Sequence, residues 1–238
     1  TGSGKTTTLY AALNELNEPG MNISTLEDPV EYNLPGVNQV QIHAKQGLTF
    51  ENGLEAFLRQ DPDVIMLGEM RSLETIQTAV RAALTGHLLF STLHTTSATE
   101  TVVRLVDMGV EPFLIASALQ AVIAQRLLRR VCESCAEPDG VAKAKLAEYL
   151  PAATDAAPRR ARGCPACDGI GYRGMVAVYE LLRVTPAVRE AMSRGVSGEE
   201  LTRVARAEGM RTLKDAALSK VAAGITTLEE AVSVFPLH

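Results

Sequence analysis

Glycines, a lysine and threonines at the start of the chain could bind a phosphate group. The segment TGSGKTTTLY matches the end of the pattern G-x-x-x-x-G-K-[ST] with Gly4, Lys5 and Thr6, and the first glycine of that pattern would precede residue 1. In such a loop, backbone N–H groups and the next helix hold the β-phosphate, the lysine neutralises β and γ oxygens, and the hydroxyl holds Mg²⁺. A glycine-rich turn before an ordinary helix is the alternative. The predicted phosphate-binding residues are Gly2, Ser3, Gly4, Lys5, Thr6 and Thr7.

Carboxylates follow two of the predicted buried strands. Glu69 comes two residues after the apolar run at 64–67, where a phosphate loop needs an acid that orients the attacking water or acts on the magnesium shell. Gly68 stands where such sites usually have aspartate. A second acidic run follows the strand predicted at 22–26 and reads Glu27-Asp28-Pro29-Val30-Glu31, and a parallel sheet presents such strand ends to a ligand. A solvated or capping glutamate and a surface turn are the respective alternatives.

A histidine lies at the end of a third predicted strand. Thr85-Gly86-His87 precedes the strand at 88–93, and Ser91-Thr92-Leu93-His94-Thr95 ends it. Since this strand would end at the same edge of the sheet, His94 could reach a terminal phosphate. A single histidine is as often structural, so both interpretations stay open.

The four cysteines of the chain form two C-x-x-C pairs, Cys132 with Cys135 and Cys164 with Cys167. In a reducing compartment this pattern indicates a metal site before it indicates disulfides. Four thiolates can enclose Zn²⁺ tetrahedrally with no open position, so we expect structural rather than catalytic zinc. The interval between the pairs exceeds the commonest ribbon spacing, and a helix predicted at 141–150 fills part of it. Redox-active or simply buried cysteines are the alternative.

Composition limits the partners and the location. The 238 residues are 46% hydrophobic, which is enough for a large domain and a small one, and no run of eighteen apolar residues predicts a membrane span. The formal net charge of −5 gives no broad basic field, and the arginines within 126–130 and 159–162 form only local clusters. We therefore expect no nucleic-acid partner and a cytoplasmic protein.

Alternating apolar and amphipathic segments predict an α/β fold with a parallel sheet. The expected strands lie at 22–26, 64–67, 88–93 and 176–182, and the expected helices at 6–16, 50–60, 73–84, 98–107 and 112–129. Residues 30–42 should form two extended arms around a turn, and 151–157 a loop. The tail should be helical, because Ser197 with Glu200 and Thr227 with Glu230 have capping-box spacing.

Five segments, in order, resemble the secretion ATPases of type II secretion and type IV pilus assembly, the GspE/PilB type. They read TGSGKTTTLYAAL, ISTLEDPVEY, DPDVIMLGEMRSLET, ALTGHLLFSTLHTTSA and QRLLRRVCESC. The resemblance covers essentially the whole chain, and it is far more specific than a phosphate loop alone. The cysteine pairs also resemble the tetracysteine subdomain of assembly and secretion ATPases, which pilus-retraction ATPases usually lack. The cysteine pairs therefore favour a motor that extends a pilus over one that retracts it.

The resemblance implies a RecA-like P-loop motor with ATP, Mg²⁺ and Zn²⁺ as cofactors. It would form a homo-hexameric ring, peripheral to the cytoplasmic face of a bacterial inner membrane, and drive pilin-like subunits to polymerise through a platform protein and a cytoplasmic adaptor. Carried over by motif, Lys5 and Thr6 bind phosphate and Mg²⁺, Glu31 belongs to an aspartate box, Glu69 is the catalytic glutamate and His94 senses the γ-phosphate. The expected domains are a RecA-like ATPase core at 1–130, a zinc subdomain at 131–182 and a helical region at 183–238.

Two further expectations concern a residue that departs from the family pattern and the amino-terminal domain of the family. Ser72 stands where the family usually has aspartate, in Gly-Glu-x-Arg-Asp. The family's amino-terminal domain supplies arginines to the nucleotide, and such an arginine contributes about 10³ to 10⁵ in rate, so the isolated fragment should be nearly inactive. A RecA-like nucleic-acid translocase or helicase with a zinc knuckle is the alternative function. The sequence does not separate type II secretion from type IV pilus assembly.

Overall fold

The computed structural model describes residues 2–150 and 155–236, so the loop expected at 151–157 lies partly outside the described residues. Packing divides the chain into two compact units. The first comprises Lys5–Val122 and Leu182–Gly209, and the second comprises Thr1–Gly4, Ile123–Leu181 and Met210–His238. The three functional domains expected from the sequence stay a prediction.

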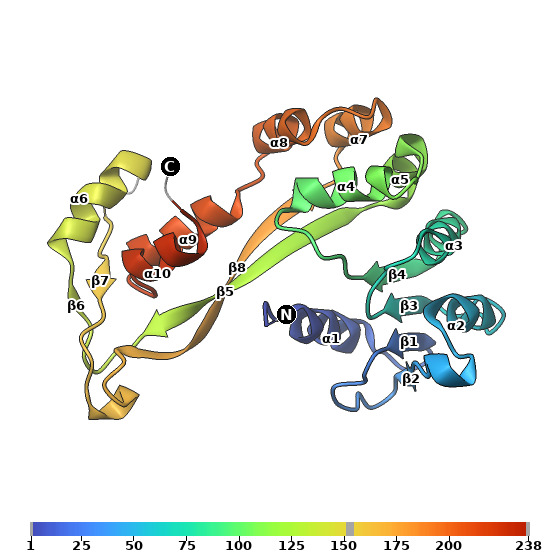
Figure 1. Cartoon of the computed structure of the whole chain (residues 1–238), viewed down its shortest axis with the longest axis horizontal. Helices are drawn as coiled ribbons and strands as arrows, with labels where there is room; N and C mark the ends of the chain where they lie inside the picture. Colours follow the sequence, from blue (N-terminus) through green and yellow to red (C-terminus); the bar gives the residue numbers. More distant parts are fainter. Residues whose placement is uncertain (1, 151–154, 237–238) are drawn as a thin grey trace. The chain divides into compact units, whose positions relative to one another are not determined.

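A parallel sheet of four strands forms the centre of the first unit (Figure 1). Its order is β2-β1-β3-β4, with β1 at Ile23–Glu27, β2 at Asn38–Gln41, β3 at Val64–Leu67 and β4 at Leu88–Ser91. In the parallel register, Leu67 of β3 lies opposite Leu26 of β1 and opposite Ser91 of β4. The predicted α/β fold is therefore confirmed, and three strands end side by side at one edge of the sheet.

Helices cover both faces of this sheet. On one face α1 (Lys5–Leu16) packs against Val64 and Met66 of β3 through Tyr10 and Leu13. The alternate residues of β3 face the other side, where α2 (Phe50–Phe57) and α3 (Leu73–Leu84) complete a second core. Because successive strand residues point to opposite faces, the continuous apolar run of β3 is what a strand buried on both sides requires.

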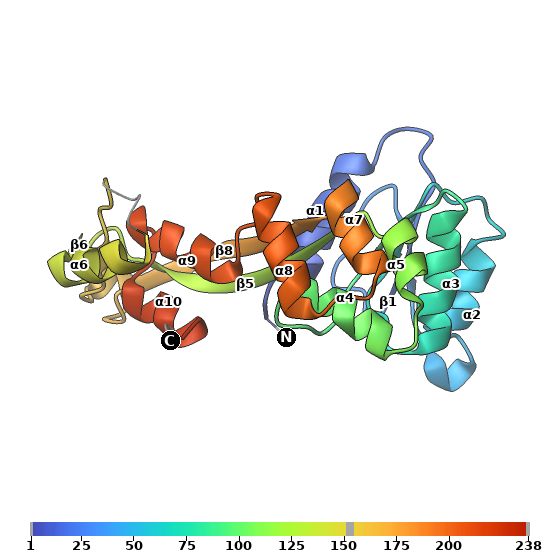
Figure 2. The same cartoon turned by 90° about the horizontal axis from the view of Figure 1, so that it is seen from above.

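Four further helices complete the first unit. They are α4 (Ala98–Asp107), α5 (Pro112–Ala118), α7 (Pro186–Ser193) and α8 (Gly198–Ala207). Figure 2 shows α7 along α5 and α8 along α4. Most helices start at a hydroxyl cap, and Ser197 accepts the backbone N–H of Glu200 at 3.3 Å as its capping spacing predicted.

Two sequence predictions for these segments are wrong. Of the two extended arms expected at 30–42, only Asn38–Gln41 is a strand. The first arm is irregular: within it, Glu31 donates its N–H to the hydroxyl of Tyr10 at 3.3 Å instead of to a neighbouring strand. The helix expected at 112–129 ends at Ala118, and the strand β5 (Ala121–Val131) follows. The apolar spacing of this segment suits either structure, and pairing with β8 (Tyr172–Arg183) decides it.

The second unit is built around the pair β5 and β8, although the boundary between the units falls inside both strands. A short antiparallel pair, β6 (Glu137–Pro138) with β7 (Arg159–Arg160), precedes the second cysteine pair. The helices of this unit are α6 (Gly140–Tyr149), α9 (Leu213–Ala222) and α10 (Leu228–Val234). Within residues 2–150 and 155–236, every helix is too short or too polar to cross a membrane.

An ion pair between the half-exposed Arg129 and the buried Glu230 fastens α10 to β5. Arg129 donates to Glu230 from its backbone N–H at 2.9 Å, from Nε at 2.8 Å and from Nη2 at 2.5 Å. The Arg129 guanidinium also lies 4.1 Å over the ring of Tyr172, and Thr226 donates to the carbonyl of Arg129 at 2.8 Å. Thr227 accepts the N–H of Glu230 at 3.1 Å, but the side chain of Glu230 accepts hydrogen bonds from Arg129 and does not complete a capping box.

The ion pair makes the stability of the second unit depend on pH. Burial raises the pKa of Glu230, but the hydrogen bonds and charge of Arg129 outweigh burial and leave this pKa below its ordinary value. A carboxyl with a depressed folded-state pKa stabilises the fold above its unfolded value of about 4.3, and that contribution is lost as pH falls through the lower folded value.

We predict that Glu230→Gln lowers the free energy of unfolding by about 1–3 kcal/mol at pH 7, because Arg129 loses the charged acceptor that the buried Glu230 provides. The difference from wild type should shrink as the pH falls below the unfolded value of about 4.3 and through the lower folded-state pKa of Glu230, below which both proteins lack the charge. Denaturant unfolding with a probe in the second unit measures both. Glu133→Gln is the control, since Glu133 pairs with Arg130 but is 79% exposed, and it should change little. Equal effects of the two variants would contradict the prediction.

Candidate nucleotide site and metal centre

The glycine loop leads directly into α1. Gly2 and Gly4 have φ angles of 80° and 79°, which lie in the left-handed region that glycine adopts without strain. Because α1 begins at Lys5, the first N–H groups of the helix lack partners within the helix, and its positive dipole end lies beside them. Lys5 and Thr6 therefore stand in the first turn of a helix whose amino end suits a phosphate.

The structure brings together the predicted catalytic glutamate and the predicted phosphate sensor. His94 Nε2 lies 3.3 Å from Glu69 Oε2, and Arg71 Nη2 lies 2.5 Å from Glu69 Oε1. The Glu69 side chain is 13% exposed, whereas His94 and Arg71 are mostly exposed. Each oxygen of the carboxylate thus faces one basic group at the end of β3.

Backbone contacts between strand ends produce this pairing. Met70 donates its N–H to the carbonyl of Thr92 at 3.1 Å, and the Thr92 hydroxyl donates to the carbonyl of Gly68 at 2.7 Å. These bonds continue the pairing of β3 with β4 past the ends of the strands. A Cβ on Gly68 would lie 3.3 Å from the carbonyl oxygen of Leu26, so close approach to β1 explains the glycine in this position.

The acidic segment after β1 divides into a buried and an exposed part. Glu27 is only 3% exposed and accepts three side-chain hydrogen bonds, so it does not face a ligand as the sequence suggested for all three acids. Asp28 and Glu31 are exposed. Glu31 donates its backbone N–H to the hydroxyl of Tyr10 at 3.3 Å, which leaves its carboxylate available.

Sequence reasoning missed three residues around these acids. Arg71 was known only as part of a motif, and neither Tyr10 nor Gln39 was singled out. Tyr10 lies three residues before Leu13, on the face of α1 that packs on the sheet, and a phenol on such a face requires a polar partner. Ser72, which departs from the family pattern, caps α3 by accepting the N–H of Thr75 at 3.2 Å.

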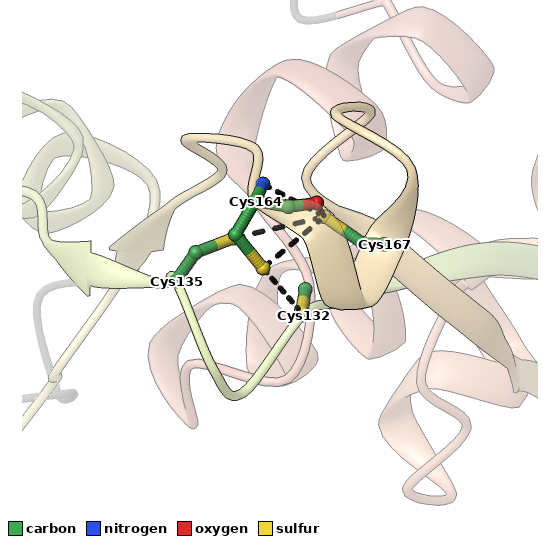
Figure 3. A group of neighbouring side chains, drawn as sticks. All are labelled: Cys132, Cys135, Cys164 and Cys167. Atoms are coloured by element: carbon green, nitrogen blue, oxygen red, sulfur yellow. Dashed lines mark hydrogen bonds between the residues drawn. The ribbon is translucent and has the colours of Figure 1, made fainter.

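The four cysteines of the second unit converge on one point (Figure 3). Cys132 and Cys135 follow β5, while Cys164 precedes and Cys167 ends a short 3-10 helix (Pro165–Cys167). All four Sγ atoms lie within 4.8 Å of one another. The distances are 3.9 Å for Cys132 to Cys164, 3.9 Å for Cys135 to Cys167 and 3.8 Å for Cys164 to Cys167.

This spacing fits zinc and not disulfides. Tetrahedral Zn–S bonds of about 2.3 Å place the sulfurs about 3.8 Å apart, while a disulfide needs about 2 Å. The N–H groups of Cys164 and Gly171 each donate to Cys167 Sγ at 3.2 Å. Burial raises the pKa of the Cys167 thiol, but these donors and the neighbouring sulfurs outweigh it and lower the pKa to about 7. A Cβ on Gly163 would lie 2.3 Å from the Gly169 carbonyl, so only glycine fits there.

Comparisons with known proteins agree on one family. Residues 1–233 match the family described as Type II/IV secretion system protein. The chain is 49% identical over 235 residues to the type II secretion system protein HxcR of Pseudomonas aeruginosa, covering 98% of this chain and 46% of HxcR. It is 47% identical over 236 residues to the type IV pilus assembly ATPase PilB of Thermus thermophilus, covering 98% of this chain and 26% of PilB.

A solved structure supports the same conclusion. The pilus retraction motor PilT with bound ADP matches with a TM-score of 0.73 and 31% identity, covering 99% of this chain and 59% of the PilT chain. The parallel sheet, the glycine loop and this match define an ATPase fold of the PilT type. The chain belongs to the Type II/IV secretion system protein family and is a homologue of the type II secretion and type IV pilus assembly ATPases. It spans less than half the length of these two relatives.

We predict that the cysteine cluster holds one structural zinc ion per chain. A structural zinc contributes about 10 to 16 kcal/mol in small metal-folded modules, so its removal should unfold residues near 131–182 and spare the sheet of the first unit. Limited proteolysis with mass spectrometry, before and after chelation, locates the cleavage sites. Re-adding Zn²⁺ is the control and should restore resistance. Unchanged resistance near 131–182 after verified metal loss would reject the prediction.

Proposed function

We propose that this chain is the ATP-hydrolysing part of a ring motor for type II secretion or type IV pilus assembly. The observation that carries the proposal is the contact of Glu69 with His94 at the ends of adjacent parallel strands, in a chain with a phosphate-binding loop. An acid and a basic sensor beside a bound γ-phosphate are the groups that phosphoryl transfer to water requires.

Each residue has a proposed task. Gly2 to Gly4 and the amino end of α1 bind the phosphates, with Thr7 beside them, and Lys5 neutralises the β and γ oxygens. Thr6 would hold Mg²⁺, which supplies charge neutralisation at the phosphates when bound. Glu69 orients the attacking water, His94 senses the γ-phosphate, and Glu31 acts from the exposed acidic loop.

Glu69 must leave its present contacts to do this. Both of its oxygens already have a partner, Arg71 and His94, so an attacking water must displace one of these contacts before it can bond to Glu69. Arg71 is 73% exposed, so its bond to Glu69 is easily exchanged for water or phosphate. The contact with His94 gives nucleotide a way to reorient the carboxylate, because a γ-phosphate competes for the same imidazole.

The partners follow from the family. We propose a homo-hexamer at the cytoplasmic face of a bacterial inner membrane, associated with it through a platform protein and a cytoplasmic adaptor. Arg160 and Arg162 both form ion pairs with Glu137, so the arginines of this region are partly neutralised within their own unit. This supports the expectation of no nucleic-acid partner. The tetracysteine cluster favours assembly or secretion over retraction.

The proposal predicts that Glu69→Gln abolishes Mg²⁺-dependent ATP hydrolysis in the longer protein that contains this chain. We expect kcat to fall by about 10² to 10⁴, with nucleotide affinity kept, because the amide cannot accept a proton. Glu55→Gln, an exposed carboxylate on α2, is the matched control and should leave kcat unchanged. The cytoplasmic part of a platform protein should stimulate wild type. Stimulation by DNA alone would instead support the translocase.

A second prediction concerns the chain by itself. Residues 1–238 should hydrolyse ATP at least about a thousandfold more slowly than the longer protein, because arginines from outside the chain contribute about 10³ to 10⁵ in rate. Steady-state phosphate release from both proteins, at equal concentrations of folded chain, makes the comparison. Turnover by the isolated chain at the rate of the longer protein would show that this chain needs no outside arginine.

A further inference from the structure

The buried carboxylate at the end of β1 is held by donors from three elements. Glu27 accepts the hydroxyl of Thr25 at 2.6 Å and the amide of Gln39 on β2 at 3.1 Å. Its other oxygen accepts the phenol hydroxyl of Tyr10 on α1. A buried charge is tolerated only when such donors replace water, so each of the three contributes to keeping the carboxylate in place.

The Tyr10 hydroxyl is the meeting point of this network. It donates to Glu27 and accepts the backbone N–H of Glu31 and the amide of Gln39, each at 3.3 Å. The residue is 1% exposed. Burial and the bond to Glu27 raise the pKa of Tyr10 to about 12, so the phenol stays protonated at neutral pH and remains a donor.

Gln39 extends the network into the loop after β1. Its amide donates to the carbonyl of Tyr32 at 3.1 Å, and its oxygen accepts the N–H of Leu34 at 2.6 Å. The ring of Tyr32 also meets the ring of Tyr10 edge to face, with centroids 4.6 Å apart. The loop that contains Glu31 is thus fixed on both sides of that residue by groups that touch Tyr10.

Tyr10 stands on the helix that begins with the phosphate-binding residues. Lys5 and Tyr10 are five positions apart in α1, or about 7.5 Å along its axis. The helix is rigid over this length, so a bond at Tyr10 fixes the acidic loop (residues 28–31) relative to Lys5. A phenylalanine would fill the same apolar space, and only the hydroxyl explains the bonds to Glu27 and Glu31.

We infer that Tyr10 is a positioning residue, which holds the acidic loop in register with the phosphate-binding end of α1 during ATP hydrolysis. The inference rests on the proposed function, since it assigns the acidic loop a part in that reaction. Tyr10 acts through Glu27 and the backbone of Glu31, and it touches no reacting group itself.

The test uses Tyr10→Phe in the longer protein, with Tyr32→Phe as the matched control. Tyr32→Phe removes a phenol from the neighbouring ring but keeps the carbonyl that accepts Gln39. We expect Tyr10→Phe to lower kcat about tenfold, with KM for ATP and the melting temperature close to wild type. Hydrogen exchange should become faster in a peptide spanning 28–34, because the Glu31 N–H loses its acceptor, and remain unchanged in a peptide from β3.

A second variant protects the test against misfolding. Glu27→Gln keeps the shape of the network and removes its charge, and its effect on kcat should not add to that of Tyr10→Phe, because both act through one contact. Unchanged kcat and exchange in Tyr10→Phe, or an equal loss of kcat in Tyr32→Phe, would overturn the inference. So would a parallel loss of kcat, nucleotide affinity and melting temperature, which indicates general destabilisation.

The outcomes also separate this inference from the proposed function. If wild type shows no hydrolysis that depends on Glu69, the proposed function fails and the catalytic part of the inference fails with it. The exchange data then still decide whether Tyr10 holds the acidic loop. If wild type hydrolyses ATP and Tyr10→Phe matches it, the proposed function stands and the role of Tyr10 is rejected.

Discussion

The parallel pairing of β1, β3 and β4 is the constraint on which the candidate site depends. Parallel strands in register end at one edge, so the residues after each strand become neighbours although they are distant in sequence. The Gly68 N–H donates to the Leu26 carbonyl at 2.7 Å, and Met70 donates to Thr92. These bonds carry the register beyond the strands, and they place Glu69 beside His94, where the two side chains lie 3.3 Å apart.

Each unit contains a buried glutamate that joins a helix to a strand. Glu27 connects β1 to α1 through Tyr10, and Glu230 connects α10 to β5 through Arg129. Both carboxylates have donors from more than one group, which offsets the loss of water. The two carboxylates differ in the charge of their partner: a neutral phenol donates to Glu27, and a positively charged guanidinium donates to Glu230.

The sequence predicts elements best where burial is uniform. The continuous apolar run of β3 and the hydroxyl-capped helices α3 and α4 are local signals, and the structure has these elements within a few residues of the predicted ranges. The sequence predicts a helix over most of β5 because its leucines and arginines fit the period of a helix as well as that of a strand. The pairing of β5 with β8, which makes it a strand, depends on residues about fifty positions later. The burial of Glu27 beneath Tyr10 is not predicted for a similar reason. An acid at the end of a strand is expected to be exposed, and the phenol that covers it is distant in the sequence.

Pairing between strands that are distant in sequence brings the four cysteines of the metal site together. Cys132 follows β5 and donates its N–H to the carbonyl of Gly171, directly before β8, at 2.9 Å. This bond and the pairing of β5 with β8 hold the two cysteine pairs near each other, and β6 with β7 closes the interval again at Glu137 and Arg160. The free energy of closing a loop grows only with the logarithm of its length, so the long interval between the cysteine pairs adds little to it. The long spacing that looked unusual for a zinc ribbon is thus a consequence of placing the knuckles at the end of a strand pair.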